Sequence, residues 1–164
     1  MPILTTNSLD FVSRSAEQTL RLGLRLGALL KTGDVILLSG DLGSGKTTFV
    51  QGLAKGWGAV DQVSSPTFVL VNQYRRLNGS LMHHLDAYRI ESSIEAEALD
   101  ITAMLDDSVL VVEWAERISE ALPAEHLRID FSWLGDEQRN LVFYPVGEDY
   151  LRLLEQFRRL AFGG

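Results

Sequence analysis

Apolar residues recur along this chain at two different spacings, which predict an alternation of helices and strands. Leucines at helical spacing follow a Ser-Ala-Glu-Gln capping box that starts at Ser15, so we predict a helix over 15–31. The continuous apolar run at 109–112 is typical of a central strand covered on both faces. Gly56 and Gly58 are expected to end the helix that precedes them. Other runs predict strands at 35–39, 127–133 and 140–145 and helices at 46–57, 92–99, 114–121 and 149–161.

Two β-prone runs, 67–77 and 80–86, are joined by Asn78-Gly79, a dipeptide that suits a two-residue type I′ turn. Because this hairpin is antiparallel, the sheet cannot be purely parallel. The order of elements predicts one α/β domain over 1–164, with three layers, a mixed sheet of central parallel strands and an antiparallel hairpin. A ligand of such a sheet is expected at the carboxyl ends of its strands.

The segment Gly-Asp-Leu-Gly-Ser-Gly-Lys-Thr at 40–47 is a complete Walker A sequence between an apolar run and a predicted helix. Its glycines let backbone N–H groups point at phosphate oxygens, and the helix adds the positive end of its dipole. Lys46 should reach the β/γ-phosphates, and the Thr47 hydroxyl should ligate Mg²⁺. Glycine-rich turns also occur in folds without ligands, but the full motif in this context favours a P-loop NTPase. The residues expected to bind nucleotide here are Asp41, Leu42, Gly43, Ser44, Gly45, Lys46, Thr47 and Thr48.

Composition and charge narrow the function classes. The 164 residues are 46% hydrophobic, enough for one domain with a substantial core. The absence of cysteine excludes disulfides and thiolate metal sites. No apolar stretch is long enough to span a membrane, and the N-terminus lacks a signal pattern, so a cytoplasmic protein is expected. A formal net charge of −7 repels nucleic acid and anionic membranes, so a role involving RNA would run through a protein partner.

Two acidic residues lie where strands are predicted to end. Glu113 follows the apolar run at 109–112, where its carboxylate could reach Mg²⁺ or orient a water, although a strand-end glutamate can also simply face solvent. Asp86 ends the hairpin and is a second candidate for the metal shell, although such an Asp is often a turn residue. The adjacent His83 and His84 should point to opposite faces of their strand, so they cannot chelate one ion together, and packing roles are expected for both.

The segment Ser65-Pro66-Thr67 lies between the Walker A helix and the hairpin, where many nucleotide switches carry a loop. The hydroxyls of Ser65 and Thr67 could sense the γ-phosphate. Ser-Pro is equally an ordinary turn signal, so the sequence leaves both interpretations open.

Taken together, four blocks resemble the TsaE family, the small ATPase of bacterial tRNA threonylcarbamoyladenosine synthesis. They lie at 40–49, 65–68, 84–89 and 113–117, and the resemblance covers nearly the whole chain. The Walker A block is shared with many NTPases, whereas the other three in combination are more specific. Two departures, Ala87 and Ala115, remove no polar group and affect only local loop shape.

The resemblance implies roles for individual residues. Lys46 would neutralise the phosphates of ATP, Thr47 and Glu113 would hold Mg²⁺, and Asp86 would complete the active arrangement. The segment at 65–67 would act as a switch. The start of the first helix would lie near the base, and Arg139 would approach the nucleotide.

The resemblance also implies partners, the TsaD and TsaB proteins, with tRNA reached only indirectly. Two other classes stay open from the residues alone. A small-molecule kinase would use the same phosphate site but needs an acceptor pocket and usually an Arg-rich lid, and no arginine-dense insertion is present. A nucleotide-gated binding module would keep Lys46 and Thr47 without significant hydrolysis.

Overall fold

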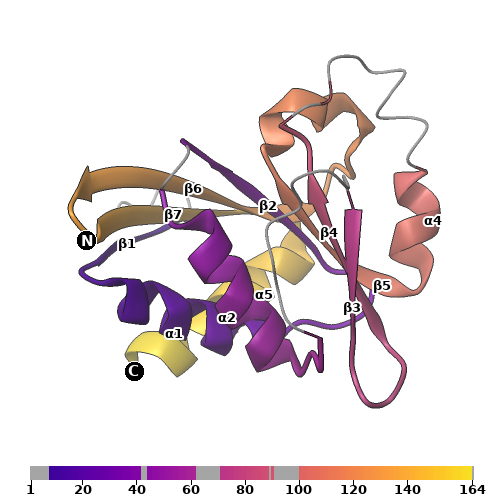
Figure 1. Cartoon of the computed structure of the whole chain (residues 1–164), viewed down its shortest axis with the longest axis horizontal. Coiled ribbons are helices and arrows are strands. Elements are labelled where there is room, and N and C mark those ends of the chain that lie inside the picture. The colour runs from indigo at the N-terminus through magenta and orange to yellow at the C-terminus, as the bar shows by residue number, and fades with distance from the viewer. Residues whose placement is uncertain (1–7, 42–43, 62–70, 89, 91–99, 164) are drawn as a thin grey trace.

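The computed structural model describes residues 8–41, 44–61, 71–88, 90 and 100–163, which form a seven-stranded mixed sheet with helices on both faces (Figure 1). The strands lie in the order β1-β7-β6-β2-β5-β4-β3. The strands are β1 (Leu9–Ser13), β2 (Val35–Gly40), β3 (Val71–Arg75), β4 (Leu81–Asp86), β5 (Ser108–Glu113), β6 (His126–Gly135) and β7 (Gln138–Val146). The helices are α1 (Ala16–Gly27), α2 (Lys46–Trp57), α4 (Ile101–Asp106), the 3₁₀ helix η1 (Ala115–Ala121) and α5 (Glu148–Phe162).

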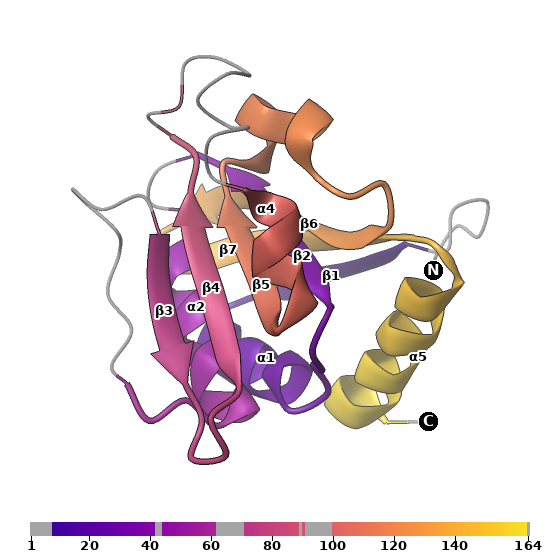
Figure 2. The same ribbon diagram turned by 90° about the vertical axis from the view of Figure 1, so that its right-hand side faces the viewer.

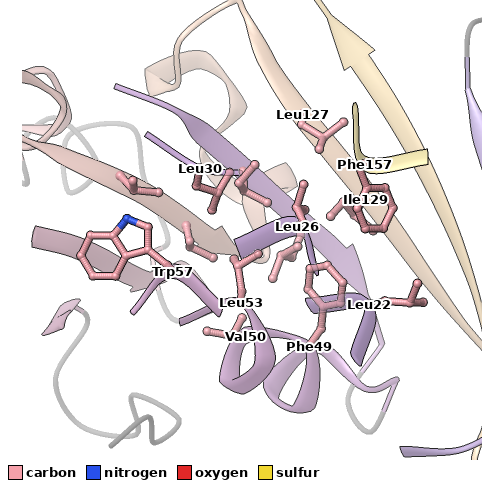
Figure 3. Packing of buried hydrophobic residues seen from close by; sticks show 14 of the residues in the cluster. Leu22, Leu26, Leu30, Phe49, Val50, Leu53, Trp57, Leu127, Ile129 and Phe157 are labelled. Carbon is pink, nitrogen blue, oxygen red and sulfur yellow. The ribbon is translucent and has the colours of Figure 1, made fainter. Parts of the chain in front are cut away.

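The four central strands, β6, β2, β5 and β4, are parallel, and β7, β1 and β3 pair antiparallel at the two sides. Because side chains alternate along each strand, the sheet buries two separate apolar clusters. One cluster joins the sheet to α1, α2 and α5, and Figure 3 shows Leu26, Leu53 and Phe49 within it beside Leu127 and Ile129 of β6. The other lies beneath α4 and η1, and Figure 2 shows α4 in front of β4 and β5. The predicted three-layer α/β fold is confirmed.

Glycines allow α1 and α2 to pack with their backbones in contact. A Cβ added at Gly27 would lie 2.0 Å from the Leu53 carbonyl oxygen, and one at Gly56 would lie 2.0 Å from the Leu24 carbonyl oxygen. The prediction that Gly56 ends the helix is therefore wrong: Gly56 lies inside α2 because its missing side chain admits α1. Gly58, with φ of 104°, is the residue that caps α2.

This close packing leads to a prediction about stability at Gly52. A Cβ added there would lie 2.1 Å from the Leu20 carbonyl oxygen. We expect Gly52→Ala to lower the free energy of unfolding by about 1–3 kcal/mol through overpacking. On an isolated helix the same change would stabilise by about 1 kcal/mol, so the sign of the effect is diagnostic. Chemical denaturation measures it, with Gln51→Ala on the exposed side of α2 as the control. A stabilised Gly52→Ala protein would contradict the contact between the two helices.

Several predicted boundaries change in the structure. The first helix ends at Gly27 rather than at residue 31. The N–H groups of Leu29 and Leu30 bond carbonyls three residues back instead of four, so the α-helical pattern stops there. The helix predicted at 114–121 is the kinked 3₁₀ helix η1, which starts at Ala115 and has non-helical dihedrals at Ile118. Strand β1 and helix α4 were not predicted. The predicted helix at 92–99 and the start of the hairpin at 67–70 lie outside the described residues.

The hairpin between β3 and β4 also differs from the prediction at its turn. Among the described residues, positive φ occurs at Gly79 but not at Asn78, so the turn is not type I′, which needs positive φ at both. Instead, the Gly79 N–H donates to the Arg76 carbonyl at 3.1 Å, and the Arg76 N–H donates to the Ser80 carbonyl at 3.0 Å. The loop is therefore one residue longer than predicted, and Gly79 provides the positive φ at its last position. No helix in the described part of the chain is long and apolar enough to cross a membrane.

Candidate active site

Parallel pairing brings the ends of the core strands to the start of α2. Asp86, the last residue of β4, lies opposite Glu113, the last residue of β5, and Leu38 of β2 lies opposite Glu113 on the other side. Strand β2 ends at Gly40, and α2 begins at Lys46 (Figure 1). The structure thus brings Lys46, Asp86 and Glu113 to one edge of the sheet, as the sequence predicted.

Lys46 is buried, with 5% of its surface exposed, although it begins a helix at the edge of the sheet. Its ammonium donates to the Gly40 carbonyl and lies 3.8 Å from the centre of the Trp114 ring. Burial lowers the pKa of Lys46, and the carboxylates of Glu113 and nearby acidic residues oppose that effect. The side chain is therefore held inside the site rather than free in solvent. The Trp114 ring, next to Glu113 in the sequence, covers the ammonium.

Glu113 does not face solvent, so that alternative is wrong. Only 4% of its surface is exposed, and its Oε2 lies 2.5 Å from Nε2 of His84. His84 is fully buried, and its Nδ1 lies 2.8 Å from the hydroxyl of Tyr74. His83 points away from this group and bonds Gln73 at 2.9 Å. Both histidines pack in the interior as predicted, but only His84 touches the candidate site.

The contact between His84 and Glu113 was missed at the sequence level. The sequence does contain one sign of this contact. His84 and Asp86 are two residues apart, which places both side chains on the same face of β4. What the sequence does not contain is the register between β4 and β5, which sets Asp86 opposite Glu113 and brings the histidine within reach.

Asp86 is both a turn residue and an acid with a raised pKa. Its Oδ1 accepts a hydrogen bond from the Tyr88 N–H at 2.9 Å, as a turn residue would. Burial raises the pKa of Asp86, and the neighbouring Glu113 adds to that rise, while the Tyr88 bond opposes it. Two carboxylates at the ends of adjacent strands repel each other, and a divalent cation between them would remove that repulsion.

Burial of Asp86, with the repulsion by Glu113 added to it, predicts a gain of stability when Asp86 is neutralised. An acid whose folded pKa is raised loses stability as pH rises from its ordinary range through the raised pKa. We therefore expect Asp86→Asn to raise the melting temperature of the nucleotide-free protein at neutral pH, by less than the 2–4 °C that correspond to about 1 kcal/mol for a chain of this size, because solvent screens this half-exposed group. Below the ordinary Asp range the difference should vanish. Scanning calorimetry across pH checks this, and a destabilised variant at neutral pH would contradict it.

Arg139 of β7, which the family resemblance placed near the nucleotide, lies beside Gly45 of the Walker A turn. A Cβ added at Gly45 would lie 3.5 Å from Cγ of Arg139. The Arg139 guanidinium donates from Nη1 to the carbonyls of Asp136 at 2.7 Å and Gln138 at 2.9 Å, while its buried Nε has no partner among the described residues. The buried Ser44 hydroxyl beside the same turn is also unpaired within the described part of the chain. Buried polar atoms without partners are uncommon, and both lie where a phosphate would add acceptors.

Other predicted site residues are placed in part. Thr47 and Thr48 lie in the first turn of α2, and Gly45 before them has a φ of 99° that favours glycine. Asp41 is exposed at the start of the loop. Four further predicted residues lie outside the described residues: Leu42, Gly43, Ser65 and Thr67.

The described residues contain no group of three or more His, Cys, Asp or Glu side chains that could by themselves hold a metal ion. Mg²⁺ does not require one, because it is usually held by one or two carboxylates, substrate phosphates and water. The paired ends of β4 and β5 supply two carboxylates, Asp86 and Glu113, and Thr47 begins the adjacent helix. This donor set fits a Mg²⁺ ion that arrives with a nucleotide.

Comparison with known proteins settles the family. The family model described as "Threonylcarbamoyl adenosine biosynthesis protein TsaE" matches residues 13–141. The chain belongs to the TsaE family. It is 41% identical over 144 residues to the tRNA threonylcarbamoyladenosine biosynthesis protein TsaE of Bacillus subtilis, covering 87% of this chain and 89% of that protein. The TsaE protein of Streptomyces coelicolor is 42% identical over 133 residues, covering 77% of this chain and 90% of that protein.

A solved structure supports the fold. The crystal structure of YdiB from Bacillus subtilis aligns with a TM-score of 0.75 and 34% identity, over 93% of this chain and 95% of that chain. Membership of the TsaE family, predicted from the four sequence blocks, is therefore confirmed. The matched region contains the Walker A loop, the acidic ends of β4 and β5, and Arg139.

Proposed function

We propose that this chain binds ATP with Mg²⁺ and hydrolyses it in support of the threonylcarbamoyladenosine modification of tRNA, acting through TsaD and TsaB. The observation that carries the proposal is the joint burial of Lys46 and Glu113 at the carboxyl ends of the central strands, where α2 begins. Family membership supports the pathway, because the matched relatives are named for threonylcarbamoyladenosine biosynthesis.

Each residue has a definite task in this proposal. The backbone N–H groups at the start of α2 bind phosphate oxygens, and Lys46 neutralises them once its ammonium leaves the Gly40 carbonyl. Thr47, Asp86 and Glu113 would hold Mg²⁺. That ion would supply charge for the developing oxyanion of the leaving phosphate. Arg139 presents beside Gly45 an Nε that no described residue engages, and from it Arg139 can donate to the nucleotide.

Charge supports the dependence on a metal and on partners. The carboxylates of Asp41, Asp86, Glu113 and Glu116 all act on Lys46, so the site is negative overall and disfavours a polyphosphate without a divalent cation. The whole chain carries −7, which disfavours direct contact with tRNA. We therefore propose weak hydrolysis by the isolated chain, with the segment at 65–67 acting as the switch that TsaD and TsaB engage.

A small-molecule kinase is the second candidate, and one observation favours it. A cavity of about 500 Å³ lies between η1 and the strands β2 and β6, reaches the Walker A segment at Gly40, and offers space for an acceptor. Its lining includes Ser39, Glu116 and Arg128. Transfer of the γ-phosphate to a small acceptor rather than to water would identify this activity.

One reconstitution separates the candidates. ATP turnover is measured with the chain alone, with TsaD and TsaB, and with both proteins plus tRNA, in the presence and absence of Mg²⁺. We expect turnover well below the typical enzyme rate of about 10 s⁻¹ for the chain alone and stimulation by the partners. Partner-independent hydrolysis at that rate would contradict the assembly-dependent proposal, and tight tRNA binding by the chain alone would contradict the indirect role.

A further inference from the structure

A chain of hydrogen bonds crosses three neighbouring strands and ends at Glu113. The hydroxyl of Tyr74 on β3 lies 2.8 Å from Nδ1 of His84 on β4, and Nε2 of His84 lies 2.5 Å from Oε2 of Glu113 on β5. Tyr74 has 3% of its surface exposed, His84 has none and Glu113 has 4%. We call these three residues the Tyr-His-Glu chain.

An ionised carboxylate fixes the direction of the bond between His84 and Glu113, and the tautomer of a neutral ring then fixes the bond to Tyr74. A carboxylate only accepts hydrogen bonds, so Nε2 of His84 must carry the proton that faces Glu113. In the neutral ring Nδ1 is then the acceptor, and the Tyr74 hydroxyl donates to it. One oxygen of Glu113, Oε2, is thereby engaged by His84, whereas no hydrogen bond from a described residue engages Oε1.

We propose that Tyr74 and His84 are positioning residues that fix the orientation of the Glu113 carboxylate and choose which of its oxygens the site receives. This inference rests on the proposed function, because that function is what makes Glu113 a ligand of Mg²⁺. Glu113 ends its strand, where a glutamate side chain would otherwise have several rotamers. Carboxylates that ligate metals are themselves held by hydrogen bonds from outer partners, and loss of such a partner typically costs about 10- to 100-fold in metal affinity or activity.

The neighbouring histidine provides a matched comparison. His83 is also buried, with 6% of its surface exposed, and also makes two side-chain bonds, to Gln73 at 2.9 Å and to the Ser108 hydroxyl at 2.7 Å. It lies on the other face of β4 and does not touch Glu113. A merely structural role for buried histidines predicts equal consequences at His83 and His84, whereas the positioning role predicts a consequence for the metal at His84 alone.

The first test needs no catalysis. In nitrogen-resolved NMR spectra of the nucleotide-free protein, His84 should show the Nε2-protonated tautomer with a slowly exchanging ring proton. Glu113→Ala should shift and broaden that proton and leave His83 unchanged. A His84 ring protonated at Nδ1 alone, or insensitive to Glu113→Ala, would overturn the proposal.

The second test measures Mg²⁺ directly. The affinity of the ADP-loaded protein for Mg²⁺ is titrated by calorimetry for His84→Leu, His84→Gln, Tyr74→Phe and the control His83→Leu. We expect about a 10- to 100-fold loss for His84→Leu, partial recovery in His84→Gln because its amide can still donate, a smaller loss for Tyr74→Phe, and no change for His83→Leu. Metal-free ADP affinity should be unchanged in all four.

Equal losses in His83→Leu and His84→Leu, or unchanged Mg²⁺ affinity in both His84→Leu and Tyr74→Phe, would overturn the positioning role. Tyr74→Phe keeps the ring and its packing, so it decides the matter if His84→Leu does not fold. Failure of the proposed function looks different: the wild-type protein would show no Mg²⁺-dependent ATP turnover with its partners, while the NMR tautomer and the effect of Glu113→Ala on it would still report whether the Tyr-His-Glu chain exists.

Discussion

Glu113→Gln should keep the fold and lose Mg²⁺-dependent ATP turnover by at least about 100-fold, the upper range seen when only an outer partner of a metal ligand is lost. The amide occupies the same volume, and its oxygen can still accept the bond from His84, so the buried Tyr-His-Glu chain is retained. What disappears is a negative charge beside the proposed Mg²⁺ position, and an uncharged oxygen is a much poorer ligand for a hard cation. Turnover measured with partners over a range of Mg²⁺ concentrations checks the prediction.

The structure supplies a close control for this variant. Glu116 lies three residues further along, and its carboxylate also acts on Lys46, but it faces the cavity and accepts a bond from the Ser39 hydroxyl at 3.3 Å. Glu116→Gln therefore removes the same charge from the neighbourhood without touching the end of β5, and we expect less than a tenfold effect. Wild-type turnover of Glu113→Gln at limiting Mg²⁺ would remove Glu113 from the metal shell.

The parts of this fold that sequence predicted well are those whose pattern is local. The Walker A glycines, the apolar run before them and the following helix are specified within about twenty residues, and β2 and α2 fall at or within one residue of the predicted ends. Strand β5 is similar, because burial on both faces requires a continuous apolar run. Lys46, Asp86 and Glu113 could be grouped in advance, since parallel strands of one sheet end at one edge.

What sequence missed depends on contacts between distant segments. Strand β1 has a half-exposed pattern and is stabilised by pairing with β7, which lies more than 100 residues away. Gly56 looks like a helix stop because its neighbour across the α1 and α2 contact, Leu24, is invisible in the local pattern. His84 was assigned to packing for the same reason, because its bond to Glu113 follows from strand register.

Lys46→Ala should lower the affinity for Mg²⁺–ATP by about 10- to 100-fold, because a charge-assisted contact to phosphate contributes roughly 1.5–3 kcal/mol. The acidic residues around Lys46 should bring this loss of affinity toward the upper end of that range. Without the Lys46 ammonium the site keeps the carboxylates of Asp86, Glu113 and their neighbours, which then repel the phosphates with one positive charge fewer to offset them. Isothermal titration gives the affinity, and Lys55→Ala, which removes an exposed lysine from the other end of α2, serves as the control.

The pH dependence of binding provides an independent check on Lys46. Burial lowers the pKa of this lysine, so the free protein begins to lose its ammonium as pH rises through that lowered pKa, before an ordinary lysine would titrate. Nucleotide affinity should therefore fall at alkaline pH in the wild-type protein and in Lys55→Ala, whereas Lys46→Ala should bind weakly at every pH and show no such fall. Unchanged ATP affinity in folded Lys46→Ala would refute the phosphate site, because no other described lysine lies at the start of α2.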